Sequence, residues 1–317
     1  MGLFEYLVDQ QIPFEKDAHL SKKSWVKTGG VCGCWITPQT VKQLTDICRY
    51  LYAEKISFEV VGHTSNIFFH STYQPQVVVS TVKVCYYEVG EDVITCDCGA
   101  QVVKLAKECL SLGYAGFYGL VGLPGTVAAS VYGNAGCFDC SISSMLVSVD
   151  VLLPDGSIRT FTKDECGFAK RSSIFKRKEV SGIILSVKLR ATRAEDIEKE
   201  KEKSEKTVEY RRTKQEKPSW CLGSVYGNMV MKRNARNSIA LALATLAATL
   251  HISSKRKATK RILLSLYGFR DLNPYVSDFN VNTFIWRDEN AEQMFDRYKC
   301  FMSKVYNNLA IEIEERI

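Results

Sequence analysis

Long apolar runs, paired metal-binding motifs and basic patches interleaved with aromatic residues are all missing from this sequence. The longest apolar run, 239–252, is interrupted by two threonines and a histidine. It falls short of the roughly 20 residues that a membrane span needs. No basic leader precedes an apolar stretch at the N-terminus, so we expect neither a secretory signal nor a membrane span and predict a cytoplasmic protein. The lack of aromatics among the basic residues argues against a nucleic-acid partner.

The apolar run itself has two interpretations. We predict a helix buried in protein, because the run is too short to cross a bilayer. Basic residues flank it, with Arg233 and Arg236 before the run and Lys255, Arg256 and Lys257 after it. Contact of this helix with a membrane surface is therefore the alternative.

Few of the twelve cysteines have the spacing of metal ligands. Only Cys137 and Cys140 have the separation of zinc ligands, and no second pair or histidine cluster follows at a usable distance. Because a structural zinc ion takes four ligands, we predict no metal site. Without a secretory signal the thiols should stay reduced, and we expect most of them to be small buried apolar side chains.

The composition that remains is that of an ordinary globular protein. The 317 residues are 46% hydrophobic and 24% charged, which suits two or three packed units. The net charge of +7 is compatible with a phosphate-bearing ligand. We find no internal repeat. The stretch 193–217 is dense in Glu and Lys, and we predict that it forms a solvated connecting helix.

Short strand patterns alternate with helical ones in the first 190 residues. Helical periodicity predicts helices over 36–52 and 102–112, the first opened by a Thr-Pro-Gln-Thr turn. Runs of apolar and β-branched residues predict strands at 58–61, 77–80, 93–96, 146–153, 158–161 and 182–189. The alternation favours an α+β or α/β fold.

Two glycine-containing segments have the chemistry to hold a nucleotide. Residues 62–66 follow a predicted strand, and a tight turn of this kind can present backbone N–H groups to phosphate. The segment 119–136 holds five glycines around Pro124. Small residues on both sides of the proline would let a flat ligand lie against bare backbone. A purely structural glycine-rich turn is the alternative.

Three later segments carry polar side chains that could act on a ligand. Arg171 stands near the apolar Phe168 and Ile174, so we expect partial burial, and a buried guanidinium needs an anionic partner or ligand. Ser224 follows a glycine, and a serine beside a glycine is ordinarily a turn residue. The acidic residues at 312–315 close the chain, where such a run is ordinarily solvated.

Taken in chain order, these segments resemble the UDP-N-acetylenolpyruvoylglucosamine reductase family. Gly-Leu-Pro-Gly-Thr at 122–126, followed by Asn-Ala-Gly at 134–136, looks like the family's central signature. Residues 62–66 are similar to its Gly-Ser-Asn flavin loop, and 171–175 to its Arg-Asp-Ser-x-Phe segment. Three more motifs, at 223–228, 276–282 and 312–316, resemble Gly-Ser-Val-Phe-x-Asn, Val-Ser-Glu-Lys-His-Ala-Asn and Glu-Pro-Glu-Val-Arg.

The resemblance implies an α+β fold. Two subdomains of the vanillyl-alcohol-oxidase type would hold FAD, and a C-terminal α+β domain would cover the substrate. On this pattern we assign residues 1–83 and 84–194 to the two FAD-binding subdomains. Residues 195–317 would form the charged connecting helix and the substrate-binding domain.

The resemblance also implies a reaction of peptidoglycan biosynthesis. NADPH would reduce FAD, and a hydride would then reach C3 of the enolpyruvyl group of a UDP-sugar substrate. Arg171 and Glu314 would stabilise the enolate, since developing charge needs fixed donors aimed at it. Ser224 would deliver the proton to C2, and Lys170 and Asn228 would bind the substrate. The residues implied to bind FAD are Gly62, His63, Thr64, Ser65, Asn66, Gly122, Pro124, Gly125, Thr126, Asn134, Ala135 and Gly136.

The sequence departs from the family pattern in several places. Lys170 stands where the family usually has tyrosine, and Asn280 replaces the histidine of the late motif. His63 and Thr64 stand where glycines are common, and the segment 229–275 is unlike its family counterpart. Two other functions therefore stay open: a related flavoenzyme with a different substrate, and a non-catalytic flavin- or nucleotide-binding protein.

Overall fold

The computed structural model describes residues 2–317. Residue 1, with which the first predicted subdomain begins, lies outside them, and so does the side chain of Pro218. The chain forms two compact units. The first unit comprises the residues up to Leu20, Gly30–Thr64 and Tyr73–Tyr210. The second unit comprises Ser21–Gly29, Ser65–Thr72 and Arg211–Ile317.

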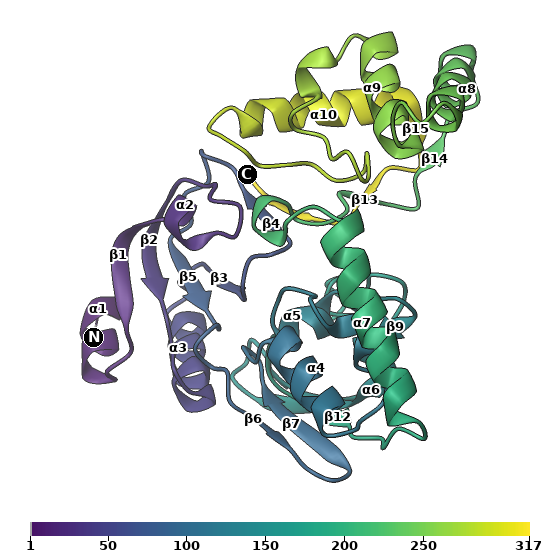
Figure 1. Cartoon of the computed structure of the whole chain (residues 1–317). Helices are drawn as coiled ribbons and strands as arrows, with labels where there is room; N and C mark the ends of the chain where they lie inside the picture. The colour runs from purple at the N-terminus through teal and green to yellow at the C-terminus, as the bar shows by residue number, and fades with distance from the viewer. Residues whose placement is uncertain (1) are drawn as a thin grey trace. The chain divides into compact units, whose positions relative to one another are not determined.

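The first sheet of the first unit has four strands in the order β1-β2-β5-β3. These strands are β1 (Phe14–His19), β2 (Val31–Ile36), β5 (Val77–Ser80) and β3 (Phe58–Val61). Helix α3 (Val41–Ala53) packs on this sheet, and α1 (Leu3–Asp9) lies near β1 (Figure 1). The hydroxyl of Thr40 accepts a hydrogen bond from the Gln43 N–H and so caps α3. The predicted helix and the strands at 58–61 and 77–80 are confirmed.

The second sheet of the first unit is antiparallel throughout, in the order β11-β10-β12-β7-β6. Its strands are β11 (Ile158–Thr162), β10 (Leu146–Leu152), β12 (Ile183–Arg190), β7 (Val93–Asp97) and β6 (Tyr87–Val89). Helices α4 (Val102–Ser111) and α5 (Val127–Tyr132) share a core with this sheet. Leu105, Ala106 and Leu110 of α4 are buried in that core, as helical periodicity predicts.

The remaining elements of the first unit are short, apart from one helix. They are β8 (Gly136–Cys137), β9 (Cys140–Ser141) and α6 (Ile142–Met145), while α2 (Leu20–Lys23) begins in the first unit and continues into the second. The predicted charged helix is α7 (Ile197–Lys214). Ion pairs along it, such as Glu198 with Lys201, stabilise an exposed helix. The boundary between the units falls inside α7, after Tyr210, whereas our assignment placed the whole helix with the C-terminal domain.

The second unit is built mainly from three long helices and small pairs of strands around an aromatic core. Its helices are α8 (Ala235–Thr249), α9 (Lys255–Tyr267) and α10 (Ala291–Val305). Its strands are β4 (Ile67–Phe69), β13 (Tyr226–Gly227), β14 (Val230–Met231), β15 (Tyr306–Asn307), β16 (Ala310–Ile311) and β17 (Glu314–Arg316). Phe68, Phe284, Trp286 and Phe295 contact one another with ring centroids 4.2–5.4 Å apart.

The apolar run 239–252 forms most of α8, and the prediction that this helix is buried is wrong. Only Asn237, Ala240 and Ala244 of α8 are buried. The side toward α9 carries alanines, which let two helices approach closely, and the large aliphatic residues lie elsewhere on the helix. None of the helices in residues 2–317 combines the length and apolarity that a membrane crossing requires.

The cysteines behave as predicted in the described residues. All twelve are free thiols, and nine of them are buried. Burial raises the pKa of several, such as Cys98, to about 12, so these thiols stay protonated and unreactive near neutral pH.

A buried ion pair stabilises the second unit. The side chain of Lys260 is only 3% exposed, and its ammonium group lies 2.5 Å from Asp278. It also donates to the backbone carbonyls of Asn273 and Val276. Lys257 pairs with the same carboxylate at 2.8 Å. Partial burial raises the pKa of Asp278, but hydrogen bonds from the two lysines outweigh it and hold this pKa below its usual 3.8.

We predict that Asp278→Asn lowers the free energy of unfolding by about 1–3 kcal/mol, because it leaves a buried ammonium without its counter-charge. A carboxylate with a depressed folded-state pKa stabilises the fold above its unfolded pKa. The difference between wild type and variant should therefore be constant near neutral pH and shrink as the pH falls below 3.8. Urea unfolding of wild type and variant at several pH values measures this difference in the free energy of unfolding. Asp296→Asn removes an exposed pair with Lys299 and should change stability by less than about 1 kcal/mol.

Candidate functional site

The first unit contains a pocket of about 410 Å³ that gathers several predicted site residues. Asn134 and Gly136 line it together with Lys170 and Arg171. Lys170 and Arg171 form the tip of a tight turn, in which Ala169 and Ser172 exchange backbone hydrogen bonds. The side-chain amide of Asn134 donates to the carbonyl of Ala169 at 2.9 Å. This bond joins the predicted cofactor segment to the turn that carries Arg171.

Arg171 itself is half-buried and has a φ of 55°. A non-glycine residue in the left-handed region is uncommon and frequently marks a functional turn. Ser173 anchors the turn to the helix α5 region, because its buried hydroxyl donates to the carbonyl of Tyr132 at 2.7 Å. The guanidinium is therefore presented to the pocket from an ordered backbone.

The two predicted flavin segments of the first unit touch each other. A Cβ atom at Gly62 would lie 2.7 Å from the Oγ1 of Thr126, so only glycine fits there. Thr126 is buried and caps α5 by accepting from the Ala129 N–H. Gly122 and Gly125 adopt φ values of 82° and 129°, which glycine tolerates without strain.

Other glycines of the 119–136 segment have structural explanations. A Cβ at Gly119 would lie 2.2 Å from the carbonyl oxygen of Cys137, and one at Gly136 would lie 2.3 Å from that of Cys140. The ligand-cradle interpretation is therefore wrong for Gly119, because protein backbone occupies the space beside it. Gly136 lines the pocket and packs against the β8–β9 hairpin at the same time.

The loop after β3 divides between the two units. Gly62, His63 and Thr64 belong to the first unit, and Ser65 and Asn66 to the second. Burial, followed by the charge of Lys104, lowers the pKa of His63 below 6.5. The imidazole is therefore neutral at pH 7. Thr64 is buried, and its hydroxyl donates to the carbonyl of His63.

In the second unit, Ser224 lies in a segment that is held on two sides. Gly223 has a φ of 79°, so the turn before Ser224 requires the left-handed region that glycine favours. Ser224 is half-buried. The next residue, Val225, donates its N–H to the carbonyl of Asn282 and accepts from the N–H of Glu312.

Asn282 is buried and binds the backbone of Tyr226 twice. The Tyr226 N–H donates to its Oδ1 at 2.9 Å, and its Nδ2 donates to the Tyr226 carbonyl at 2.6 Å. Ser277 orders the same motif by accepting from the N–H groups of Phe279 and Asn280. The motif at 276–282 thus positions the Ser224 segment.

Glu314 reaches the neighbourhood of the Ser224 segment through the C-terminal strands. Strand β16 pairs antiparallel with β13, and β17 pairs parallel with β4. The Glu314 N–H donates to the carbonyl of Asn66, and the amide of Asn66 donates to the carbonyl of Glu312. Arg316 contacts the Glu314 carboxylate at 3.4 Å.

The second unit therefore brings together Ser224, Glu314, Ser65 and Asn66 along adjacent backbone segments. Asn228 is exposed just beyond β13, with a φ of 51°. Arg171 and Lys170, with Gly62–Thr64 and the 122–136 residues, are in the first unit. The catalytic, substrate-binding and FAD-binding roles of these residues remain predictions.

A nucleotide cofactor would meet an unsatisfied acceptor in the first-unit pocket. The Oδ1 of Asn134 is buried and has no hydrogen-bond partner in the described part of the chain. Leaving a buried acceptor unpaired costs about 1–3 kcal/mol. A ligand N–H or O–H at this place would remove that cost, so the residues present fit a hydrogen-bonding cofactor such as FAD. Asn134 was predicted, but its unpaired oxygen is visible only in the fold.

Part of the pocket wall lies outside the site residues predicted from the sequence. Asp139, Cys140 and Ser141 line the pocket beside Arg171. They belong to the β8–β9 hairpin, and the short spacing between Cys137 and Cys140 signals such a hairpin. From the sequence, this spacing suggests a weak metal motif or buried thiols rather than a pocket wall. The described residues contain no group of three or more potential metal ligands.

The similar proteins reported below belong to one enzyme family. A model of the FAD binding domain matches residues 33–162. A UDP-N-acetylenolpyruvoylglucosamine reductase of Caldicellulosiruptor saccharolyticus is 28% identical over 206 residues, covering 65% of each chain. One of Halalkalibacterium halodurans is 32% identical over 203 residues, covering 64% of this chain and 66% of that one. The chain thus spans a little under two thirds of the length of these relatives.

A solved structure shares the fold along nearly the whole chain. The crystal structure of UDP-N-acetylenolpyruvylglucosamine reductase from Thermus caldophilus superposes with a TM-score of 0.66 and 19% identity. The match covers 96% of this chain and all of that one. The predicted α+β architecture, with an FAD-binding fold and a further C-terminal α+β domain, is confirmed.

We predict that Asn282→Ala lowers the free energy of unfolding by about 2–4 kcal/mol, because two buried backbone groups of Tyr226 lose their partners. Asn282→Asp keeps the acceptor and should cost less. Asn307→Ala changes an exposed asparagine of β15 and should be nearly neutral. Thermal unfolding followed by circular dichroism measures all three. Equal midpoints for Asn282→Ala and wild type would show that the amide does not hold this segment.

Proposed function

We propose a function from the premise that this chain belongs to the UDP-N-acetylenolpyruvoylglucosamine reductase family. The protein is an FAD-dependent reductase that converts UDP-N-acetylenolpyruvoylglucosamine to UDP-N-acetylmuramate with NADPH. One observation carries the proposal. The family motifs at 223–228, 276–282 and 312–316 are far apart in sequence, yet hydrogen bonds through Val225, Asn282 and Glu312 join them.

FAD, when bound, supplies the hydride for C3 of the enolpyruvyl group. Gly62, Thr126 and Asn134 would hold it, together with the other residues of the 62–66 and 122–136 segments. The contact between Gly62 and Thr126 keeps two of these loops together. The unpaired Oδ1 of Asn134 offers an acceptor for a ligand donor.

Three side chains would serve the substrate. Arg171 presents a fixed positive charge, which stabilises negative charge on the carboxylate side of the enolpyruvyl group. Glu314 would assist by hydrogen bonding to the same enolate. Ser224 would donate the proton to C2, which requires its hydroxyl to lie within hydrogen-bond reach of that carbon.

Two further residues and two ligands complete the proposal. Lys170 is exposed at the rim of the pocket that Arg171 lines, where a cation would attract the diphosphate of a UDP-sugar. Asn228, at the end of β13, would contact the substrate as well. We place the reaction in the cytoplasm, where NADPH and nucleotide sugars are both supplied.

The direct test is turnover. The purified protein should show flavin absorbance and should oxidise NADPH rapidly only when UDP-N-acetylenolpyruvoylglucosamine is added. Full flavin occupancy without substrate-dependent NADPH oxidation would contradict the proposed substrate and would leave a flavoenzyme of another specificity.

Ser224→Ala separates the two half-reactions. Because the proton is needed only when the substrate is reduced, NADPH should reduce the bound flavin at the wild-type rate. Substrate-dependent turnover should fall by about 10²–10⁴-fold, the usual contribution of a positioned proton donor. Stopped-flow absorbance measures both steps. Ser238→Ala, at an exposed serine of α8, should change neither, and unchanged turnover of Ser224→Ala would exclude the serine as the donor.

A further inference from the structure

Helix α8 presents its large aliphatic side chains to solvent. Ile239, Leu243, Leu246 and Leu250 are 49%, 48%, 55% and 58% exposed. An α-helix turns about 100° per residue, so positions i, i+4, i+7 and i+11 fall on one side of it. These four residues therefore form a single outer stripe. The following turn adds Ile252, which is 74% exposed.

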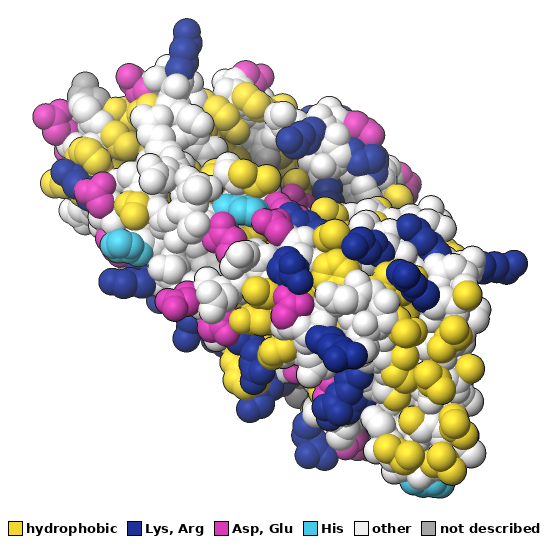
Figure 2. Space-filling model, turned by 90° about the horizontal axis from the view of Figure 1, so that it is seen from above, with side chains coloured by type: hydrophobic (Ala, Val, Ile, Leu, Met, Phe, Trp, Pro, Cys, Tyr) yellow, Lys and Arg dark blue, Asp and Glu magenta, His cyan; other side chains and the backbone are white. Residues whose placement is uncertain are grey.

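The buried residues of α8 lie on the opposite side and are small, although Leu241 on that side is 39% exposed. Asn237, Ala240 and Ala244 pack toward α9, with which α8 forms a helical hairpin. A helix of a globular protein ordinarily turns its large apolar residues inward, and α8 does the reverse. Figure 2 shows the consequence, because yellow side chains gather on the surface over α8. An exposed apolar patch of this kind is typical of an interaction site.

The charge around the stripe has one sign. From Lys217 to Arg270, with both included, the sequence has ten Lys and Arg residues and no Asp or Glu. The whole chain carries +7, so the rest of it is net negative. Lys257 and Lys260 pair with Asp278 from outside the segment. The other basic residues leave the α8–α9 hairpin strongly positive.

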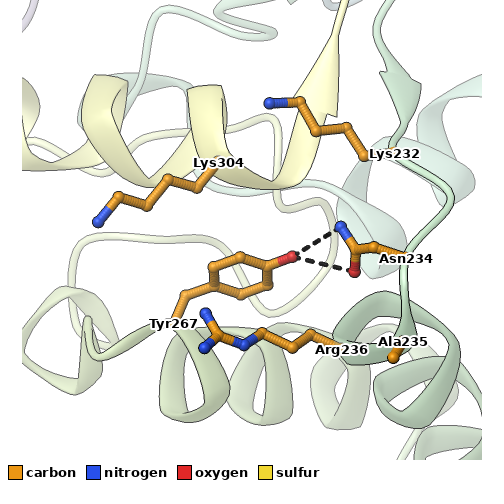
Figure 3. A pocket seen from close by; sticks show the side chains of 6 residues that line it. All are labelled: Lys232, Asn234, Ala235, Arg236, Tyr267 and Lys304. Carbon is orange, nitrogen blue, oxygen red and sulfur yellow. Dashed lines mark hydrogen bonds between the residues drawn. The ribbon is translucent and has the colours of Figure 1, made fainter.

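A basic pocket of about 550 Å³ lies at the N-terminal end of the stripe. Lys232, Arg236 and Lys304 line it, and no carboxylate is among the lining residues that the structure describes. Figure 3 shows Tyr267 between Arg236 on one side and Lys232 and Lys304 on the other. The Tyr267 hydroxyl is fixed by hydrogen bonds with Asn234. Arg236 lies over the Tyr267 ring at 5.5 Å, and Lys232 donates to the carbonyl of Ser303 at 2.6 Å. Three cations around one pocket suit an anion such as a phosphate group.

The positive charge of the α8–α9 hairpin decides what could cover the aliphatic stripe. A second copy of this chain would bring an equally positive hairpin against the first, which like-charge repulsion opposes. An anionic bilayer offers apolar tails for the aliphatic stripe and phosphates for the cations. With 15 residues, α8 is about 22 Å long. It is too short to cross the roughly 30 Å hydrocarbon core, so it would lie along the surface.

We propose that α8 docks on the surface of an anionic phospholipid bilayer. Ile239, Leu243, Leu246 and Leu250 enter the boundary between headgroups and acyl chains. The pocket of Lys232, Arg236 and Lys304 binds a headgroup phosphate. The protein is thereby a peripheral membrane protein on this face, independently of the reaction proposed above.

Vesicle co-sedimentation of the full chain tests this docking. The protein should bind vesicles of phosphatidylcholine that contain about one third phosphatidylglycerol. It should bind vesicles of pure phosphatidylcholine much more weakly. Raising the salt from about 0.1 M to about 1 M shortens the Debye length from about 10 Å to about 3 Å. It should therefore weaken binding to the anionic vesicles.

Paired variants separate the two parts of the surface. Leu243→Gln with Leu246→Gln should lower binding at least about tenfold, because the stripe loses two inserting side chains. Arg236→Gln with Lys304→Gln should lower binding to anionic vesicles only. The matched control is Leu112→Gln with Ile158→Gln, which changes exposed apolar residues of the first unit and should bind like wild type. Circular dichroism and flavin absorbance check that each variant is folded.

Two results would overturn the proposal. The first is a wild-type protein that does not sediment with anionic vesicles, or α8 variants that sediment equally well. The second is a stable dimer in light scattering that the Leu243→Gln, Leu246→Gln variant converts to a monomer, because the stripe would then be covered by a second copy.

Discussion

The pairing of the C-terminal strands is the constraint on which the second unit depends. Residues 310–311 pair with β13, and 314–316 pair with β4, which follows the predicted flavin loop at 62–66. The C-terminal residues thus pair, in two short sheets, with chain segments that lie more than 80 residues away in sequence. Closing such long loops costs chain entropy. The aromatic core around Phe68 and Phe295 supplies compensating apolar burial.

A second feature of this unit is the separation of its charges. Positive side chains concentrate on the α8–α9 hairpin, and Asp278 pairs with two of them, Lys257 and the buried Lys260. Lys260 can be buried because its ammonium group finds one carboxylate and two carbonyls. The remaining cations stay at the surface beside the aliphatic stripe of α8. Apolar and positive groups on one face together favour an anionic, partly apolar partner over water alone.

Much of the candidate site could be read from residue types, although its arrangement could not. Glycine and asparagine motifs indicated the segments at 62–66 and 122–136, and the structure joins them through Gly62 and Thr126. The same reasoning misjudged Gly119, whose glycine is needed because the Cys137 carbonyl lies beside it. Close approach of backbone from another segment leaves no mark in local sequence. The unpaired oxygen of Asn134 is likewise a property of its surroundings.

Local elements followed from the sequence because their causes are local. The cap at Thr40, the apolar face of 41–53 and the β-branched runs at 58–61 and 77–80 depend on neighbours within a few residues. Tertiary structure alone decided the burial of α8, because a helix that is apolar on most sides has no periodicity to say which side meets the core. It also decided that Asn282 and Glu312 fix the segment of Ser224, since those contacts join residues that only folding brings together.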